Sequence, residues 1–269
     1  MTPARFGNAL CAVGSNRRGD SAGGMITNPR APYDLVATSQ GLGARVRGTR
    51  PGPERDLVDW FLTEFPIPAP AGQRVTVFRE PRLESGSPDV VAVSWREVTA
   101  AGWPVQRAQL RRGDLRLLHL LGSFGPLEES DFKELGEVDP WRSLERLDQL
   151  QLINLKGTAW RAAPVCRTFA VTRIVAFEAK LADWTRAIGQ ASINRWFASE
   201  SYVLISDAPR TSTLMVKARS AGVGVWVAGA RRPLLAAPRD PVRQPISYAS
   251  WLFNEWAWRS AGLGAADGP

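Results

Sequence analysis

Apolar runs of strand type alternate with stretches of helical spacing along most of this chain, and that alternation restricts the fold more than any other feature. The strand-type runs are rich in valine and isoleucine and lie at residues 74–79, 89–95, 168–177, 202–205 and 223–227. Apolar residues recur at helical spacing in residues 53–65, 182–198 and 213–220. Helices and strands in this order predict an α/β fold with a mixed β-sheet flanked by helices.

The chain before residue 53 lacks such a pattern. It is rich in glycine, proline, serine and arginine without sustained periodicity, and residues 1–53 carry seven arginines against two acidic residues. We therefore expect residues 1–52 to form a flexible basic N-terminal arm. Pro53 and Glu54 then fit the first turn of a helix, where a proline is tolerated and an acidic side chain is favourable.

The single histidine and the two cysteines exclude several classes of enzyme. His119 lies in an apolar helical pattern, so we expect a packed or half-exposed helix residue and no catalysis by a histidine cluster, a Ser-His-Asp triad or a Cys-His pair. Two cysteines are too few for a disulfide framework. The sequence shows neither a signal-peptide pattern nor an apolar run long enough to span a membrane, so we expect a cytoplasmic protein without a membrane partner.

Charged residues stand where two of the predicted strands begin and end. Asp89 opens the second strand, and Glu178-Ala179-Lys180 closes the third. Glu178 and Lys180 would project from the same face, because side chains alternate along a strand. Two carboxylates about 4 Å apart repel by about 4 kcal/mol at an effective dielectric of about 20, so Asp89 and Glu178 would share a site only around a cation. Taken separately, Asp89 also fits a turn residue, and Glu178 with Lys180 a solvated ion pair.

Residues 111–163 interrupt the strand pattern. Three short helical patterns are followed by a hairpin pattern that turns at Lys156-Gly157, and this order resembles a winged helix-turn-helix domain. The resemblance implies that the third helix and the hairpin contact DNA through Arg142, Arg146, Gln149, Lys156 and Arg161. The segment has eight basic and nine acidic residues, however, so a structural or protein-contact role stays open.

With residues 111–163 set aside as an inserted domain, the order of the remaining elements resembles the PD-(D/E)XK nuclease superfamily, which includes restriction endonucleases and archaeal Holliday-junction resolvases. The matching residues are Pro88-Asp89, Glu178-Ala179-Lys180, Gln190 on the following helix and Glu54 on the first helix. The resemblance covers about residues 53–95 and 168–227. It implies a restriction endonuclease-like sheet in a discontinuous domain, residues 53–110 and 164–269, with the strands of Asp89 and Glu178 side by side.

The resemblance also implies a role for each residue at the strand ends. Asp89, Glu178 and the main-chain carbonyl of Ala179 would bind Mg²⁺ or Mn²⁺, for which oxygen atoms are suitable ligands. Lys180 would orient the attacking water and stabilise charge near the scissile phosphate. Gln190 would position the lysine or the water.

Two residues on the helices extend this site. Glu54 would contribute to a second metal site or hold a neighbouring ligand in place. Arg186 precedes Gln190 by one helical turn and is a candidate phosphate contact.

These expectations describe a metal-dependent endonuclease that hydrolyses phosphodiester bonds in DNA, in bacterial defence and restriction or in DNA repair and recombination. The net charge of +8 suits a polyanionic partner, although an arginine-rich composition alone also explains it. Two alternatives stay open: a non-catalytic DNA-binding regulator that uses the winged helix on a nuclease-fold scaffold, and an RNA-processing nuclease. The aromatic C-terminal stretch, residues 248–258, either packs on the core or forms a homodimer.

Overall fold

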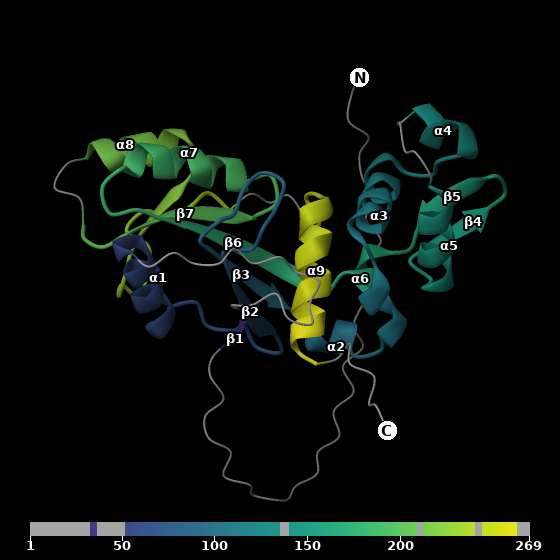
Figure 1. Cartoon of the computed structure of the whole chain (residues 1–269), viewed down its shortest axis with the longest axis horizontal. Coiled ribbons are helices and arrows are strands. Elements are labelled where there is room, and N and C mark those ends of the chain that lie inside the picture. Colours follow the sequence, from purple (N-terminus) through teal and green to yellow (C-terminus); the bar gives the residue numbers. More distant parts are fainter. Residues whose placement is uncertain (1–32, 37–51, 135–139, 209–211, 240–243, 263–269) are drawn as a thin grey trace, which may run out of the picture. The chain divides into compact units, whose positions relative to one another are not determined.

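The computed structural model of the chain describes residues 33–36, 52–134, 140–208, 212–239 and 244–262 (Figure 1). The chain divides into two compact units, residues 1–31 and 32–269, and all described residues belong to the second. Most of the predicted N-terminal arm, residues 1–52, lies outside the described residues. The prediction is wrong for Asp34–Val36, which form the edge strand β1 of the main sheet.

Among the described residues, the main sheet has six strands in the order β1-β2-β3-β6-β7-β8. Their bounds are Asp34–Val36, Arg74–Arg79, Val90–Trp95, Val171–Ala179, Glu200–Ile205 and Gly224–Val227. β3 runs antiparallel to both β2 and β6, whereas β6, β7 and β8 run parallel to one another and β1 runs parallel to β2. The prediction of a mixed α/β sheet is confirmed.

β3 and β6 are hydrogen-bonded neighbours, although residues 111–163 lie between them in the sequence. Val90 pairs with Phe177, and Val93 pairs with Ile174. Every residue of β3 is buried, because helices cover both faces of the sheet at this strand. The apolar side chains of β3 pack into one hydrophobic cluster on each face. The intervening residues therefore leave the two strands adjacent, and the end of β6 lies beside the start of β3.

Helix α1 (Pro53–Thr63) covers one face of the sheet. Its Leu57 and Phe61 lie in a hydrophobic cluster with Phe177 of β6 and Tyr202 of β7. The helical spacing of the apolar residues produces this buried side, as predicted. Trp60 is an exception within the apolar pattern, because 47% of its surface remains exposed.

Helices α7 (Trp184–Asn194), α8 (Thr213–Ser220) and α9 (Tyr248–Ser260) pack on the other face, and Figure 1 shows α7 and α8 on the side of the sheet opposite α1. Every residue of α9 from Ala249 to Trp258 is buried. Aromatic residues of α9 pack against β2 and against Phe197, which follows α7. The aromatic C-terminal stretch therefore packs on the core, which is the first of the two predicted alternatives.

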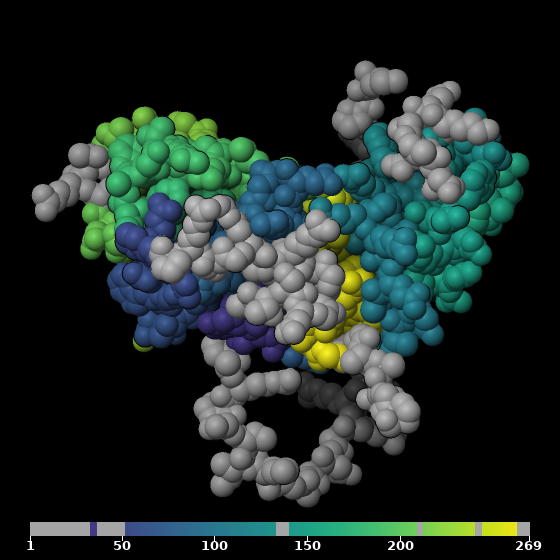
Figure 2. All heavy atoms as spheres, in the orientation of Figure 1, coloured from purple at the N-terminus to yellow at the C-terminus, as the bar shows by residue number. Residues whose placement is uncertain are grey.

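Where the structure describes residues 111–163, they form three helices and a hairpin in the predicted order. The elements are α3 (Arg112–Phe124), α4 (Glu129–Glu134), α5 (Trp141–Gln149), β4 (Ile153–Lys156) and β5 (Ala159–Ala162). Gly157 at the hairpin turn has a φ of 65°, a conformation that glycine adopts at little cost. Buried leucines of α3 and α5 belong to one hydrophobic cluster with residues of α9 and of the main sheet. In Figure 2 the yellow atoms of α9 lie beside the teal atoms of residues 111–163.

Short helices complete the connections. They are α2 (Glu97–Ala100), the 3₁₀ helix η1 (Val105–Gln109) and α6 (Val165–Thr168). His119 of α3 is partly buried, and burial lowers its pKa, so it is the packed helix residue that its sequence context predicts. Within the described ranges, no helix combines the length and the apolar character needed to cross a membrane.

Candidate active site

A polar cavity of about 350 Å³ lies where β6 ends and β3 begins. The residues that line it are Glu54, Ser87, Asp89, Glu178, Lys180, Asp183, Arg186 and Gln190. The five side chains predicted as catalytic, together with the predicted phosphate contact Arg186, thus come from four separate segments of the chain to one cavity. Ser87 and Asp183 were not predicted as site residues.

Asp89 is fixed by a hydrogen bond across the strand pair. Its Oδ2 accepts a hydrogen bond of 2.7 Å from the amide N–H of Ala179, the last residue of β6. Asp89 directly precedes β3, and the antiparallel pairing of Val90 with Phe177 brings the two positions together. Burial raises the pKa of Asp89, while this hydrogen bond and the charge of Lys180 act in the opposite direction.

Glu178 lies beside Asp89 and is 4% exposed. Burial, followed by the negative charge of Asp89, raises the pKa of Glu178 to about 8. Asn194 of α7 donates a hydrogen bond of 2.7 Å from Nδ2 to Glu178 Oε1, which offsets part of this effect. Two poorly solvated carboxylates that disfavour each other's ionisation are the electrostatic situation that a bound cation relieves.

Lys180 joins the end of β6 to the start of α1. Its Nζ lies 2.7 Å from Glu54 Oε2, and its side chain is 16% exposed. Glu54 sits in the first turn of α1, directly after Pro53, and about half of its side chain is exposed. The ammonium group is therefore held in the cavity by a partner on a different element from Asp89 and Glu178.

Helix α7 contributes two amide side chains one turn apart. Gln190 lines the cavity, and within the described part of the chain its buried Oε1 has no hydrogen-bond partner. Asn194, four residues later, is the partner of Glu178, and the sequence reasoning missed it. The sequence did contain a signal for Asn194 as a site residue. Residues four apart share one face of a helix, and Gln190 was already predicted to belong to the site.

Asp183 caps α7 at the edge of the cavity. Its carboxylate accepts a hydrogen bond of 3.1 Å from the backbone N–H of Arg186. The side chain of Arg186 is exposed. Asp183 therefore has a structural role as the N-cap of α7. The guanidinium of Arg186, by contrast, is open to solvent at the mouth of the site.

A divalent cation fits two of these carboxylates. Within the described residues, no group of three or more His, Cys, Asp or Glu side chains is arranged to hold a metal ion. Mg²⁺ is commonly held by one or two carboxylates and otherwise keeps its water, so Asp89 and Glu178 are residues that could hold such an ion. The unpartnered Oε1 of Gln190 is a further acceptor at the same place. Ala179 contacts Asp89 through its amide, and ligation by its carbonyl stays a prediction.

The predicted DNA-contact residues of α5 are not equivalent. Arg146 does not project freely, because its Nη1 lies 2.6 Å and 2.7 Å from the two carboxylate oxygens of Asp114 in α3. Asp114 is 1% exposed, so this pair joins α5 to α3. Arg146 therefore has a structural contact, and its role in reading DNA stays a prediction. The other predicted contacts are exposed, and they are Arg142, Gln149, Lys156 and Arg161.

Comparison with known proteins adds no relative. No protein-family model, no curated protein and no solved structure matches the chain. The geometry of the cavity at the end of β6 and the order of the elements around it are therefore the basis for a functional assignment.

Proposed function

We propose that the chain is a metal-dependent endonuclease that hydrolyses phosphodiester bonds in DNA. The observation that carries the proposal is the presence of two mutually repelling carboxylates, the partly buried Asp89 and the buried Glu178, in one cavity with the ammonium group of Lys180. Hydrolysis of a phosphodiester adds negative charge to a group that is already anionic, so a site for it needs concentrated positive charge. This cavity contains the ammonium group of Lys180, and the carboxylates of Asp89 and Glu178 would bind a metal ion as a second positive charge.

Asp89 and Glu178 would hold Mg²⁺ or Mn²⁺, with the Ala179 carbonyl as an additional ligand. When bound, the ion offsets the phosphate charge and lowers the pKa of a coordinated water. The hydrogen bonds from the Ala179 amide and from Asn194 keep the two carboxylates in fixed orientations before any substrate arrives. Such preorganisation removes a reorganisation cost from the reaction.

Lys180 would orient the attacking water and balance charge beside the scissile phosphate. Its contact with Glu54 fixes the place of the ammonium group at the cavity wall. Gln190 would accept a hydrogen bond from the water or from Lys180 through its unpartnered Oε1. Arg186, at the mouth of the cavity, would contact a phosphate next to the one that is cut.

The order of the elements supports the finer description of the fold. Helix α1 precedes the antiparallel strands β2, β3 and β6, and α7 then connects β6 to the parallel strand β7. This is the order that the resemblance to PD-(D/E)XK nucleases implies for residues 53–110 and 164–269. The three helices and hairpin of residues 111–163 likewise support a winged-helix-like insert, whose exposed Lys156 and Arg161 would contact DNA phosphates.

A cleavage assay tests the proposal. Purified protein is incubated with supercoiled plasmid, linear duplex, branched DNA and single-stranded DNA, in Mg²⁺, Mn²⁺ or EDTA. We expect divalent-ion-dependent cutting that falls by about 10²- to 10⁴-fold in Lys180→Ala and Asp89→Ala. Lys217→Ala is the matched control, because Lys217 lies on α8 beside Trp184 and outside the cavity.

Three results would decide against the proposal as stated. Undiminished cutting by both Lys180→Ala and Asp89→Ala would rule out the cavity as the active site. Tight DNA binding by a wild-type protein that cuts no substrate would favour the non-catalytic regulator. Cutting of RNA in the same buffers, with no cutting of DNA, would favour the RNA-processing nuclease.

A further inference from the structure

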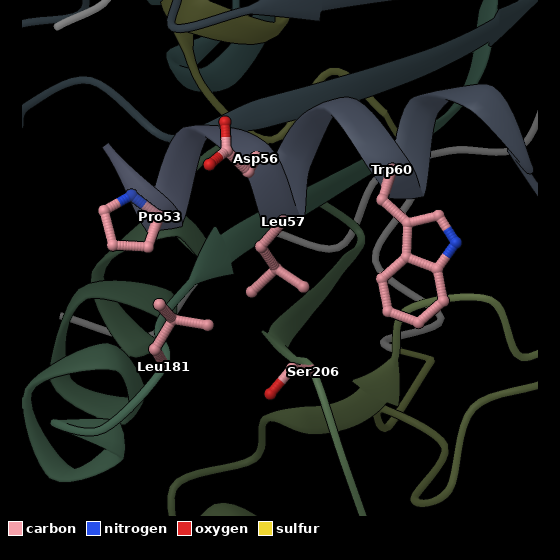
Figure 3. A pocket seen from close by; sticks show the side chains of 6 residues that line it. All are labelled: Pro53, Asp56, Leu57, Trp60, Leu181 and Ser206. Carbon is pink, nitrogen blue, oxygen red and sulfur yellow. The ribbon is translucent and has the colours of Figure 1, made fainter. Parts of the chain in front are cut away.

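A second hollow, of about 250 Å³, lies next to the proposed active site. It is lined mainly by apolar side chains, and its residues are Pro53, Asp56, Leu57, Trp60, Leu181 and Ser206. Figure 3 shows Leu57 and Trp60 projecting from α1 on the side that faces Leu181 and Ser206, with Asp56 turned away from them. We call this hollow the Trp60 cleft.

Two apolar side chains of the Trp60 cleft, Trp60 and Leu181, are half exposed. Trp60 is 47% exposed and Leu181 is 44% exposed, although both are strongly apolar. The benzene ring of the indole lies against Gly229, where a Cβ atom would come within 2.8 Å of a ring carbon. Gly229 has a φ of 78°, which suits glycine and leaves room for the ring. Exposed apolar side chains that line one hollow, as Trp60 and Leu181 do, mark a candidate binding site.

The Trp60 cleft shares a wall with the cavity of the proposed active site. Pro53 and Leu181 line the cleft, and their sequence neighbours Glu54 and Lys180 line the cavity. Lys180 and Glu54 are in contact at 2.7 Å, so the residues next to this ion pair in the sequence line the Trp60 cleft. A nucleotide whose phosphate lies against Lys180 therefore has its own base, or that of its neighbour, within reach of the indole.

We propose that the Trp60 cleft binds one unpaired nucleobase of the DNA, stacked on the indole of Trp60 and next to the scissile phosphate. The proposal rests on the proposed nuclease function, because it takes the phosphate to lie in the neighbouring cavity. Every base has a flat aromatic face, so stacking on an indole is strong and tolerates any sequence. A cleft of 250 Å³ is below the size of drug-binding pockets, about 300 to 1,000 Å³, and suits a single base.

This arrangement selects a class of substrate. A base inside a duplex must be unstacked and unpaired before it can enter the cleft, which costs a few kcal/mol. A base in a single strand, a flap or the open part of a junction is free of that cost. The substrate is therefore DNA with an unpaired nucleotide at the cut.

Binding measurements test the cleft without requiring cleavage. The probes are fluorescein-labelled single-stranded oligonucleotides in which each nucleotide in turn is replaced by an abasic residue, measured by anisotropy with Ca²⁺ as the divalent ion. For the wild type we expect one position, or two adjacent positions, at which loss of the base weakens binding by about 5- to 100-fold, the range of base–aromatic stacking. Trp60→Ala should bind intact and abasic probes equally, and Trp60→Phe should keep part of the difference.

Two further variants distinguish loss of the cleft from a general effect of the substitution on folding. Trp141→Ala removes a tryptophan of the same exposed fraction, 47%, from α5 and should retain the wild-type preference. Leu181→Ala opens the other wall of the cleft and should reduce the preference. The proposal is overturned if no base position affects wild-type binding, or if Trp60→Ala and Leu181→Ala keep the full preference.

Cleavage of the same probes in Mg²⁺ separates this inference from the proposed function. Base-dependent binding by a wild type that cuts nothing would retain the cleft as a nucleobase site and reject the nuclease. Cutting that is unaffected by Trp60→Ala and by every abasic replacement would retain the nuclease and reject the cleft.

Discussion

Asn194 Nδ2 donates a hydrogen bond of 2.7 Å to Glu178 Oε1, and both side chains are almost completely buried. A neutral amide fixes the orientation of the carboxylate but carries no charge to balance it. Burial, followed by repulsion from the neighbouring Asp89, raises the pKa of Glu178 to about 8. The ionised form of Glu178 is therefore costly in the metal-free protein, and this has consequences for stability.

The metal-free protein should lose stability as the pH rises. Because the pKa of Glu178 is about 8 in the folded state and near 4.5 in the unfolded chain, the folded state binds the proton more tightly. Its contribution is complete below about pH 4.5 and is lost as the pH rises through about 8. Urea unfolding in EDTA at about pH 5.5, 7 and 8.5 should show a falling free energy of unfolding, with a shallower fall in Glu178→Gln.

A divalent ion should reverse this trend. Mg²⁺ binds the ionised carboxylates, so it should raise the free energy of unfolding of the wild type more at about pH 8.5 than at about pH 5.5, and should do little for Glu178→Gln. Glu145→Gln, an exposed substitution on α5, serves as the control and should respond like the wild type. An identical pH profile for the wild type and Glu178→Gln would contradict the assignment of a raised pKa to Glu178.

The two neutral replacements of Asp89 should separate stability from activity. Asn keeps a carbonyl oxygen that can accept the hydrogen bond from the Ala179 amide, so Asp89→Asn should change the free energy of unfolding by less than about 1 kcal/mol. Asp89→Ala leaves that buried amide without its partner and should cost about 1 to 3 kcal/mol. Both should lose Mg²⁺-dependent cutting, measured by single-turnover assays on the preferred substrate. Normal cutting by Asp89→Asn would show that the negative charge of Asp89 is not needed.

Sequence patterns predicted the central elements of the fold well, because those patterns are local. Residues 74–79 and 213–220 were predicted with the bounds that β2 and α8 have in the structure. The edge strand Asp34–Val36 was missed, since three residues carry no usable alternation and become a strand only by pairing with β2. The short helices α2 and α6 have only four residues each and were missed for a similar reason.

The candidate site could be assembled from the sequence only where residue type, order and element coincided. Asp89, Glu178 and Lys180 stand at strand ends, and a sheet brings strand ends together. The pairing of Arg146 with Asp114 depends instead on which side chains of two separate helices, α5 and α3, meet. Such pairings have no local signature, so an arginine with a buried partner looks like a free one in the sequence.

Arg146 and Arg161 should therefore respond differently to truncation. Arg146→Ala leaves the carboxylate of Asp114 buried without its cation, and should lower the free energy of unfolding by roughly 3 kcal/mol. Arg161→Ala removes an exposed side chain of β5 and should change stability by less than about 0.5 kcal/mol. If the hairpin contacts phosphate, Arg161→Ala should also reduce the salt dependence of DNA binding by about one unit of slope. Equal stability of the two variants in urea would argue against the buried pair.

The buried ion pair between Arg107 and Glu255 should be strongly coupled. Arg107 Nε and Nη2 lie 2.8 Å and 2.7 Å from the two carboxylate oxygens of Glu255, and each side chain is at most 2% exposed. Removal of either partner leaves an uncompensated charge between η1 and α9, so Arg107→Met and Glu255→Leu should each cost about 3 to 5 kcal/mol. The double variant buries no charge and should cost clearly less than the sum of the two. A double-mutant cycle from urea unfolding measures this difference, and additive costs would mean that the two charges do not stabilise each other.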